Sequence, residues 1–157
     1  MKYLIMVLFC LIAQTSFASE KLIAGCAHLK SAKEAEFVLF NKKEFIQLGE
    51  CIAVNFIKKQ TILNLPRACE EVTENQLNPL GILSLTKLEA IYIGQCIGVI
   101  NYIYQHYHDE AVQYNRRSRR NRKYSCVKGS AAVKILSASV NDENYRNDIR
   151  DLLCTER

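Results

Sequence analysis

The sequence predicts an all-α fold, a compact disulfide-stabilised bundle of five or six helices. Three observations support this class: apolar residues at helical spacing, motifs that start helices, and few turn-forming residues, with six glycines and two prolines in 157 residues. A sandwich of many short strands needs more turns, and no convincing period-2 alternation occurs. Apolar residues make up 49% and charged residues 24%, a globular balance that excludes a disordered or collagen-like chain.

The first two predicted helices lie before residue 60. Ser31 and Glu34 form a capping box, in which each side chain bonds the backbone N–H of the other residue. A second helix is predicted over 44–59 from an apolar stripe at helical spacing: Phe45, Leu48, Gly49, Ile52 and Phe56. Residues 60–67 are predicted as a connector ending in Leu65-Pro66, and 69–81 as a polar, turn-prone segment.

The longest predicted helix covers residues 86–107 and begins at a second capping box, Thr86 with Glu89. It is apolar on nearly every side, which is typical of a helix buried in a core or crossing a membrane. Because this helix is short for a membrane span, we expect it to be the central helix of the core.

Two shorter helices are predicted near the C-terminus. Ser130 is expected to cap a helix that ends at Ser137, and Asn141 or Asp142 to start a last helix that ends at Cys154.

A nine-residue pattern occurs twice, at 46–54 and 91–99, with five of the nine positions identical. Each copy has two small residues four positions apart, which allow two helix backbones to come close. We expect these residues to pack helix on helix, within the chain or in a homodimer: Gly49, Ala53, Gly94 and Gly98. The cysteine of each copy follows its glycine by two positions, so it points to the opposite face and could be pinned there by a disulfide.

Residues 1–18 are predicted to be a cleaved secretory signal peptide, which leaves 19–157 as one helical domain. Lys2 precedes an apolar run, and Ser16 and Ala18 are the small residues expected before a cut after Ala18. An alternative is a lipoprotein signal that would place a lipid on Cys26. It is disfavoured because charged residues interrupt the apolar run before Cys26, and because lipidation would leave an odd number of thiols.

Cleavage after Ala18 leaves six cysteines in a chain bound for an oxidising compartment, and we expect three disulfides. Their pairing has fifteen possibilities that the sequence does not distinguish. No Cys-x-x-Cys pair occurs, which excludes the thioredoxin motif and the common zinc spacings. The cysteines concerned are Cys26, Cys51, Cys69, Cys96, Cys126 and Cys154.

The segment 116–123 is strongly basic and contains no acidic residue, within a chain of formal charge +5. A solvated loop would explain it, and so would contact with an anionic partner, since arginine favours bidentate carboxylate or phosphate contacts. Outside the cytoplasm such a partner could be an anionic polymer, a membrane surface or an acidic protein face. The candidate partner-binding residues are Arg116, Arg117, Arg119, Arg120, Arg122, Lys123 and Tyr124.

Nothing in the sequence points to catalysis, a metal or a cofactor. His106 and His108 are two positions apart and would not share a helix face, so with Glu110 they do not make a convincing metal site. The common hydrolase, phosphate-loop and zinc-protease motifs do not occur. We expect a protein that binds, with no catalytic residue, metal or small-molecule substrate.

Residues 94–100 (Gly-Gln-Cys-Ile-Gly-Val-Ile), 125–130 (Ser-Cys-Val-Lys-Gly-Ser) and 152–154 (Leu-Leu-Cys) resemble motifs of the Rap/Tai immunity proteins. The resemblance covers about residues 85–157. It implies a small, exported, all-helical and often dimeric protein of the periplasm. Such a protein inserts a surface loop into the active-site groove of a peptidoglycan-cleaving amidase, an effector of type VI secretion. Our own inference is that the basic segment is this loop.

Overall fold

The computed structural model describes residues 26, 29, 38–59, 64–77, 84–112, 122–138 and 146–157. Within these ranges the protein is mostly helical, with five helices packed together and one small antiparallel sheet, which confirms the predicted class. The elements in chain order are α4 (Lys42–Lys58), α5 (Leu65–Leu77), α6 (Lys87–Tyr107), β1 (Tyr124–Cys126), α7 (Ala131–Ser137), α8 (Arg146–Leu153) and β2 (Cys154–Glu156).

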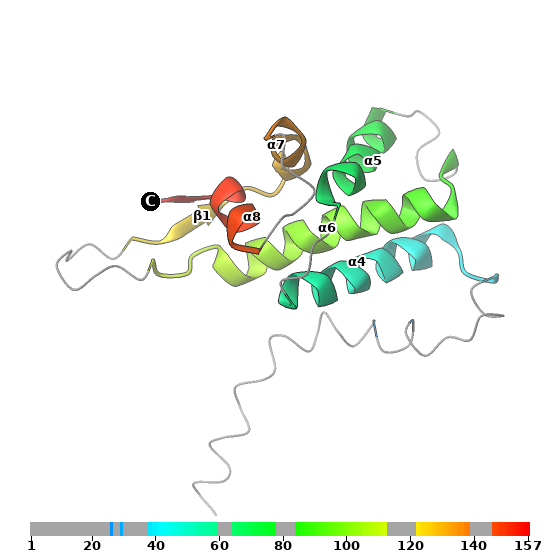
Figure 1. Cartoon of the computed structure of the whole chain (residues 1–157), viewed down its shortest axis with the longest axis horizontal. Helices are drawn as coiled ribbons and strands as arrows, with labels where there is room; N and C mark the ends of the chain where they lie inside the picture. Colours follow the sequence, from blue (N-terminus) through cyan, green and yellow to red (C-terminus); the bar gives the residue numbers. More distant parts are fainter. Residues whose placement is uncertain are drawn as a thin grey trace, which may run out of the picture.

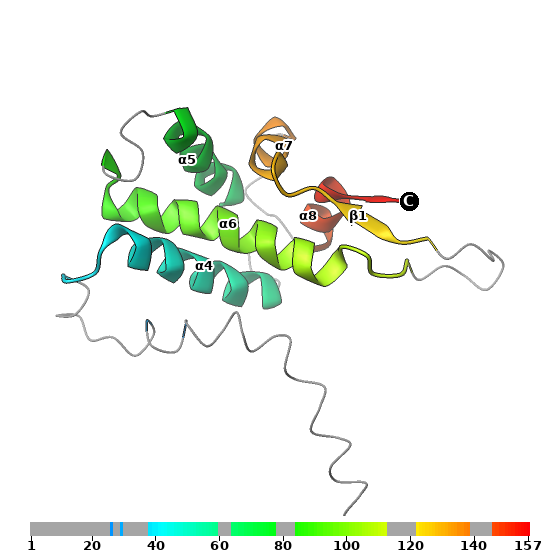
Figure 2. The same ribbon diagram turned by 180° about the vertical axis from the view of Figure 1, so that it is seen from behind.

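Helix α6 is the centre of the fold, with α4 on one side and α5 on the other (Figures 1 and 2). Helices α4 and α6 run in the same direction, so they begin at the same end of the molecule. Each begins with a complete capping box. Asn41 pairs with Glu44 in α4 and Thr86 with Glu89 in α6, and each carboxylate accepts the cap residue's N–H at 2.6 and 2.7 Å. These bonds satisfy amides that a helix start otherwise leaves unpaired.

The two copies of the repeated pattern pack directly against each other. A Cβ atom built on Gly49 would overlap the carbonyl oxygen of Ile91, and one built on Gly94 would overlap that of Ile46. Ile46 and Ile91 are equivalent positions of the two copies, so the contact is reciprocal. Because the backbones touch, no side chain larger than hydrogen fits at either glycine. The small-residue face is therefore covered within one chain.

Helix α5 lies where the sequence predicted a connector followed by turns, and that prediction is wrong. Asn64 Oδ1 accepts the N–H of Arg67 at 3.3 Å and supports the first turn. Pro66 sits in that same turn, where its missing N–H costs no helical hydrogen bond. Residues at helical spacing then bury one stripe of the helix against the core: Leu65, Ala68, Cys69 and Val72.

Three disulfides join consecutive cysteines along the chain: Cys26–Cys51, Cys69–Cys96 and Cys126–Cys154. They span 25, 27 and 28 residues. The Cys26–Cys51 disulfide joins Cys26 to the face of α4 opposite Gly49. The Cys69–Cys96 disulfide joins α5 to the face of α6 opposite Gly94. Several buried disulfides indicate a protein of an oxidising compartment outside the cytoplasm.

The C-terminal region packs against the far end of α6. Helix α7 begins after Ser130 as predicted, although the Ser130 side chain makes no capping hydrogen bond. Helix α8 ends at Leu153, and Cys154 belongs to strand β2 instead of the helix. The sequence predicted no strand, and the two strands found in the described part of the chain have three residues each, too few for a period-2 pattern to be visible.

Several predictions concern residues outside the described ranges: the signal peptide at 1–18, the capping box at Ser31, and the start of the last helix at Asn141 or Asp142. Among the helices that the structure does describe, none has the length and apolar character needed to cross a bilayer. Helix α6 instead contributes buried residues along most of its length to the main core.

Candidate functional site

The candidate site is the part of the fold that holds Arg122 and Lys123, the last two residues of the basic segment. Three extended pieces of chain lie side by side there, residues 110–112, 122–126 and 154–157, which we call the stem. The Val112 N–H donates to the Arg122 carbonyl at 3.0 Å, and the Tyr124 N–H donates to the Glu110 carbonyl at 3.0 Å. Val112 and Arg122, the described residues on either side of 113–121, are therefore held next to each other.

The C-terminus forms the other side of the stem. Strands β1 and β2 pair with Cys126 opposite Cys154 and Tyr124 opposite Glu156. Beyond them, Lys123 and Arg157 exchange N–H to carbonyl hydrogen bonds of 3.1 and 2.9 Å. The middle piece of the stem, residues 122–126, thus has a hydrogen-bonded neighbour on both sides.

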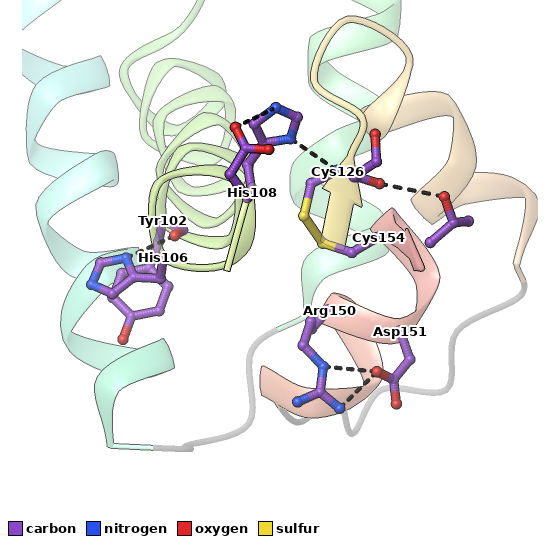
Figure 3. Close-up of a disulfide and its surroundings, with 10 residues drawn as sticks. Tyr102, His106, His108, Cys126, Arg150, Asp151 and Cys154 are labelled. Atoms are coloured by element: carbon purple, nitrogen blue, oxygen red, sulfur yellow. Dashed lines mark hydrogen bonds and ion pairs between the residues drawn. A yellow bond between two sulfur atoms is a disulfide. The ribbon is translucent and has the colours of Figure 1, made fainter. Parts of the chain in front are cut away.

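A disulfide and a histidine attach the stem to the helices (Figure 3). The Cys126–Cys154 bond joins β1 to the first residue of β2, directly after α8. The Cys126 N–H donates to His108 Nδ1 at 3.0 Å, and the His108 ring stacks on Tyr104 with centroids 4.4 Å apart. Because Nδ1 accepts this bond, the neutral ring carries its proton on Nε2. His108 is the residue that follows α6, so this bond joins the stem to the central helix.

Asp109 turns the chain out of α6 into the stem. Its φ of 66° lies in the left-handed region, which aspartate tolerates better than most residues. Its N–H donates to the Tyr124 carbonyl at 2.9 Å, and its carboxylate pairs with the guanidinium of Arg157. His108 Nε2 lies 3.7 Å from the other carboxylate oxygen.

Three of the predicted partner-binding residues lie in the described part of the stem. Arg122 is partly exposed and pairs with Glu156 at 3.1 Å. Lys123 is exposed, and Tyr124 is half-buried. The other four predicted residues, Arg116, Arg117, Arg119 and Arg120, lie outside the described ranges.

Tyr124 has a packing role in this arrangement. The Arg150 guanidinium lies 5.6 Å from the ring centroids of both Tyr124 and Tyr107, and it pairs with Asp151 at 2.7 Å. Burial raises the pKa of the Tyr107 hydroxyl above its ordinary value, so this ring stays neutral. Arg150 therefore bridges the stem and the end of α6 from the side of α8.

The other predicted site residues lie in the interior. Gly49, Ala53, Gly94 and Gly98 stand between α4 and α6, where a Cβ on Gly98 would come within 3.1 Å of the Ala53 Cβ. This location accounts for them by packing within one chain, and the face they form is not open to a second copy. The six predicted disulfide cysteines are all paired.

The two histidines face different neighbours. His106 stacks on Tyr102 with ring centroids 3.9 Å apart, while His108 stacks on Tyr104 and bonds Cys126. Across the described ranges, no three side chains of His, Cys, Asp or Glu gather in a way that could hold a metal ion.

Sequence reasoning missed the residues that fix the stem: His108 as an acceptor, Asp109, Arg150 and the pairs made by Glu156 and Arg157. The one local signal was an aspartate directly after a long helix, a position that often needs a left-handed backbone. The bonds of His108 with Cys126, of Arg122 with Glu156 and of Asp109 with Arg157 join residues 18, 34 and 48 positions apart, and no short pattern encodes them.

Comparisons of the chain with protein families, curated proteins and solved structures find no match.

Proposed function

We propose that this protein is a periplasmic inhibitor of the immunity type, which binds and blocks a peptidoglycan-cleaving amidase. The observation that carries the proposal is the stem. It holds Val112 and Arg122, the residues that flank 113–121, as one hydrogen-bonded pair, and the Cys126–Cys154 disulfide ties the strand that follows Arg122 to the helical body. A segment anchored at both ends loses less conformational entropy on binding than a free chain end does.

The ion pairs of the stem support different roles for the arginines of the stem and for those between its two ends. Arg122 and Arg157 are engaged by Glu156 and Asp109, so they hold the stem together. Four further arginines lie in the sequence between the two ends of the stem. Complementary charge between this segment and an acidic rim of the enzyme would mainly raise the association rate and select the partner.

Export is part of the proposal. The leader at 1–18 would be cut after Ala18, and the mature chain would form its disulfides in the periplasm. The resemblance to Rap/Tai immunity proteins supplies the amidase as the partner class. The alternative function is a secreted binder of an anionic polymer or membrane surface, which the same arginines would serve.

The test measures the digestion of purified peptidoglycan by a panel of type VI amidase effectors, with and without the mature protein. We expect stoichiometric inhibition of at least one enzyme. Changing the four arginines at 116, 117, 119 and 120 together to glutamine should abolish it. The control removes the same charge elsewhere by changing Lys42, Lys43, Lys59 and Lys134 to glutamine, and it should inhibit as the wild type does.

Two outcomes would contradict the proposal. The first is equal inhibition by the arginine variant and the wild type, which would remove the segment from the interface. The second is no inhibition of any enzyme together with retention on heparin or anionic vesicles that falls steeply with salt, which would favour the alternative.

A further inference from the structure

A groove of about 260 Å³ lies where α5, α6 and the turn before α7 meet, away from the stem's charged pairs. The three elements are neighbours in Figure 1. Its lining comes from α5 (Val72, Gln76), from α6 (Ile97, Ile100, Asn101), and from the turn and first residues of α7 (Lys128, Gly129, Ala132).

The chemistry of the groove is an apolar floor with a polar margin. Two isoleucines, a valine and an alanine supply the aliphatic surface. The polar residues of the lining are Gln76, Asn101 and Lys128. Within the described ranges neither amide has a hydrogen-bond partner and Lys128 has no ion pair; its Nζ lies 5.6 Å from the Tyr104 ring centroid.

The size of the groove limits its occupant. Sites for whole small-molecule ligands usually measure roughly 300–1,000 Å³. A volume of about 260 Å³ suits one or two side chains of a larger molecule better than a complete ligand. The single charged residue of the lining is a cation, so a fitting occupant carries a negative group next to its apolar part.

We propose that this groove binds a leucine- or isoleucine-sized side chain of a partner polypeptide, with an adjacent carboxylate held by Lys128. The carboxylate belongs either to a neighbouring acidic residue or to the end of the partner chain. The lining of the groove includes no residue of the basic segment, and the proposal does not depend on the amidase assignment.

The test is an NMR titration of the ¹⁵N-labelled, disulfide-bonded protein with N-acetyl-leucine, which carries both features. N-acetyl-leucinamide lacks the charge, and N-acetylglycine lacks the aliphatic group. We expect N-acetyl-leucine to shift the backbone amides of Ile97, Asn101 and Gly129 at millimolar concentration. An exposed ion pair is weak, so the uncharged analogue should bind about threefold to fivefold more weakly. N-acetylglycine should not bind.

Two variants with matched controls locate the site. A Cβ on Gly129 meets nothing within 4 Å, so Gly129→Phe should fold and obstruct the groove, whereas Ser130→Phe on the neighbouring exposed residue should not. Lys128→Gln should remove the preference for the charged probe, and Lys134→Gln should keep it. A peptide amide with an internal Leu-Asp, compared with a peptide that ends in leucine, distinguishes the two sources of the carboxylate.

Three results would overturn the proposal: shifts that map to residues outside the groove, equal affinity for the charged and uncharged probes, or binding that Gly129→Phe leaves intact. Because the probes do not involve an amidase, failure here leaves the proposed inhibition standing, and failure of the inhibition assay leaves this groove standing.

Discussion

Replacing Gly94 with alanine should force α4 and α6 apart. The new Cβ would overlap the backbone carbonyl of Ile46, and a backbone atom cannot rotate away as a side chain can. Alanine raises intrinsic helix stability over glycine by about 1 kcal/mol. Overpacking typically costs about 1–3 kcal/mol, and contact with backbone belongs at the upper end. The net expectation is a loss of about 2 kcal/mol in the free energy of unfolding.

The assay is urea unfolding of the oxidised protein, followed by circular dichroism, with the slope compared between variants. Gly129→Ala is the matched control, because its Cβ meets no atom within 4 Å, and it should change stability by no more than about 0.5 kcal/mol. Gly49→Ala makes the reciprocal contact with Ile91 and should cost about as much as Gly94→Ala.

The reasoning is refuted if Gly94→Ala unfolds at the wild-type urea concentration or above it. A larger loss in Gly129→Ala than in Gly94→Ala would contradict it equally, since the Cβ that meets no atom would then cost more than the Cβ that overlaps a backbone carbonyl.

Three further predictions concern individual side chains. Burial raises the pKa of the Glu50 carboxyl, so the folded protein binds this proton more tightly than the unfolded chain does. The free energy of unfolding should therefore fall as pH rises from the ordinary carboxyl pKa through the raised one. Glu50→Gln, which copies Gln95 of the second repeat, should raise the urea midpoint at neutral pH and leave it unchanged in acid; a lower neutral midpoint would contradict this. His108→Phe keeps an aromatic ring for stacking on Tyr104 but leaves the Cys126 N–H without its acceptor. It should lower the free energy of unfolding by about 1–3 kcal/mol and speed hydrogen exchange at the Cys126 amide. Unchanged exchange at this amide would disprove the bond. Changing Cys126 and Cys154 to serine opens a loop of 28 residues and should lower the free energy of unfolding by about 3.5 kcal/mol. Amide protection should be lost first in the stem. Protection lost first in α4 would argue against a stem held locally by this disulfide.

The helices that sequence patterns predicted well are those with local signals at their starts. Thr86 and Glu89 are three positions apart and contact only each other's backbone, so the beginning of α6 was visible without tertiary information. The apolar stripe in α4 works in the same way, because one helix face repeats along a short stretch of sequence.

Helix α5 was missed because its local sequence features, a proline and many polar residues, suggested a connector and turns. Leu65-Pro66 indicates a chain break when the proline follows a helix, yet here it lies in the first turn of one. The polar residues of α5, such as Glu70 and Glu74, lie on its exposed side, and only the position of the core shows that Leu65 and Cys69 form a buried stripe.

The stem could not be predicted because its bonds join distant parts of the chain. Val112 meets Arg122, and Lys123 meets Arg157, across strands too short to show alternation. Disulfide pairing had the same obstacle, since cysteine positions alone allow every combination. The basic composition was evident from the sequence, whereas the pairing of Val112 with Arg122 on either side of 113–121 was not.

Peptide mapping of the exported protein under non-reducing conditions tests the account most directly, because the disulfides define both the compartment and the clamped stem. The account predicts three linked pairs, Cys26–Cys51, Cys69–Cys96 and Cys126–Cys154, with no thiol free after unfolding without reductant. A reproducible free thiol among these six, or a link between cysteines of different pairs, would contradict it.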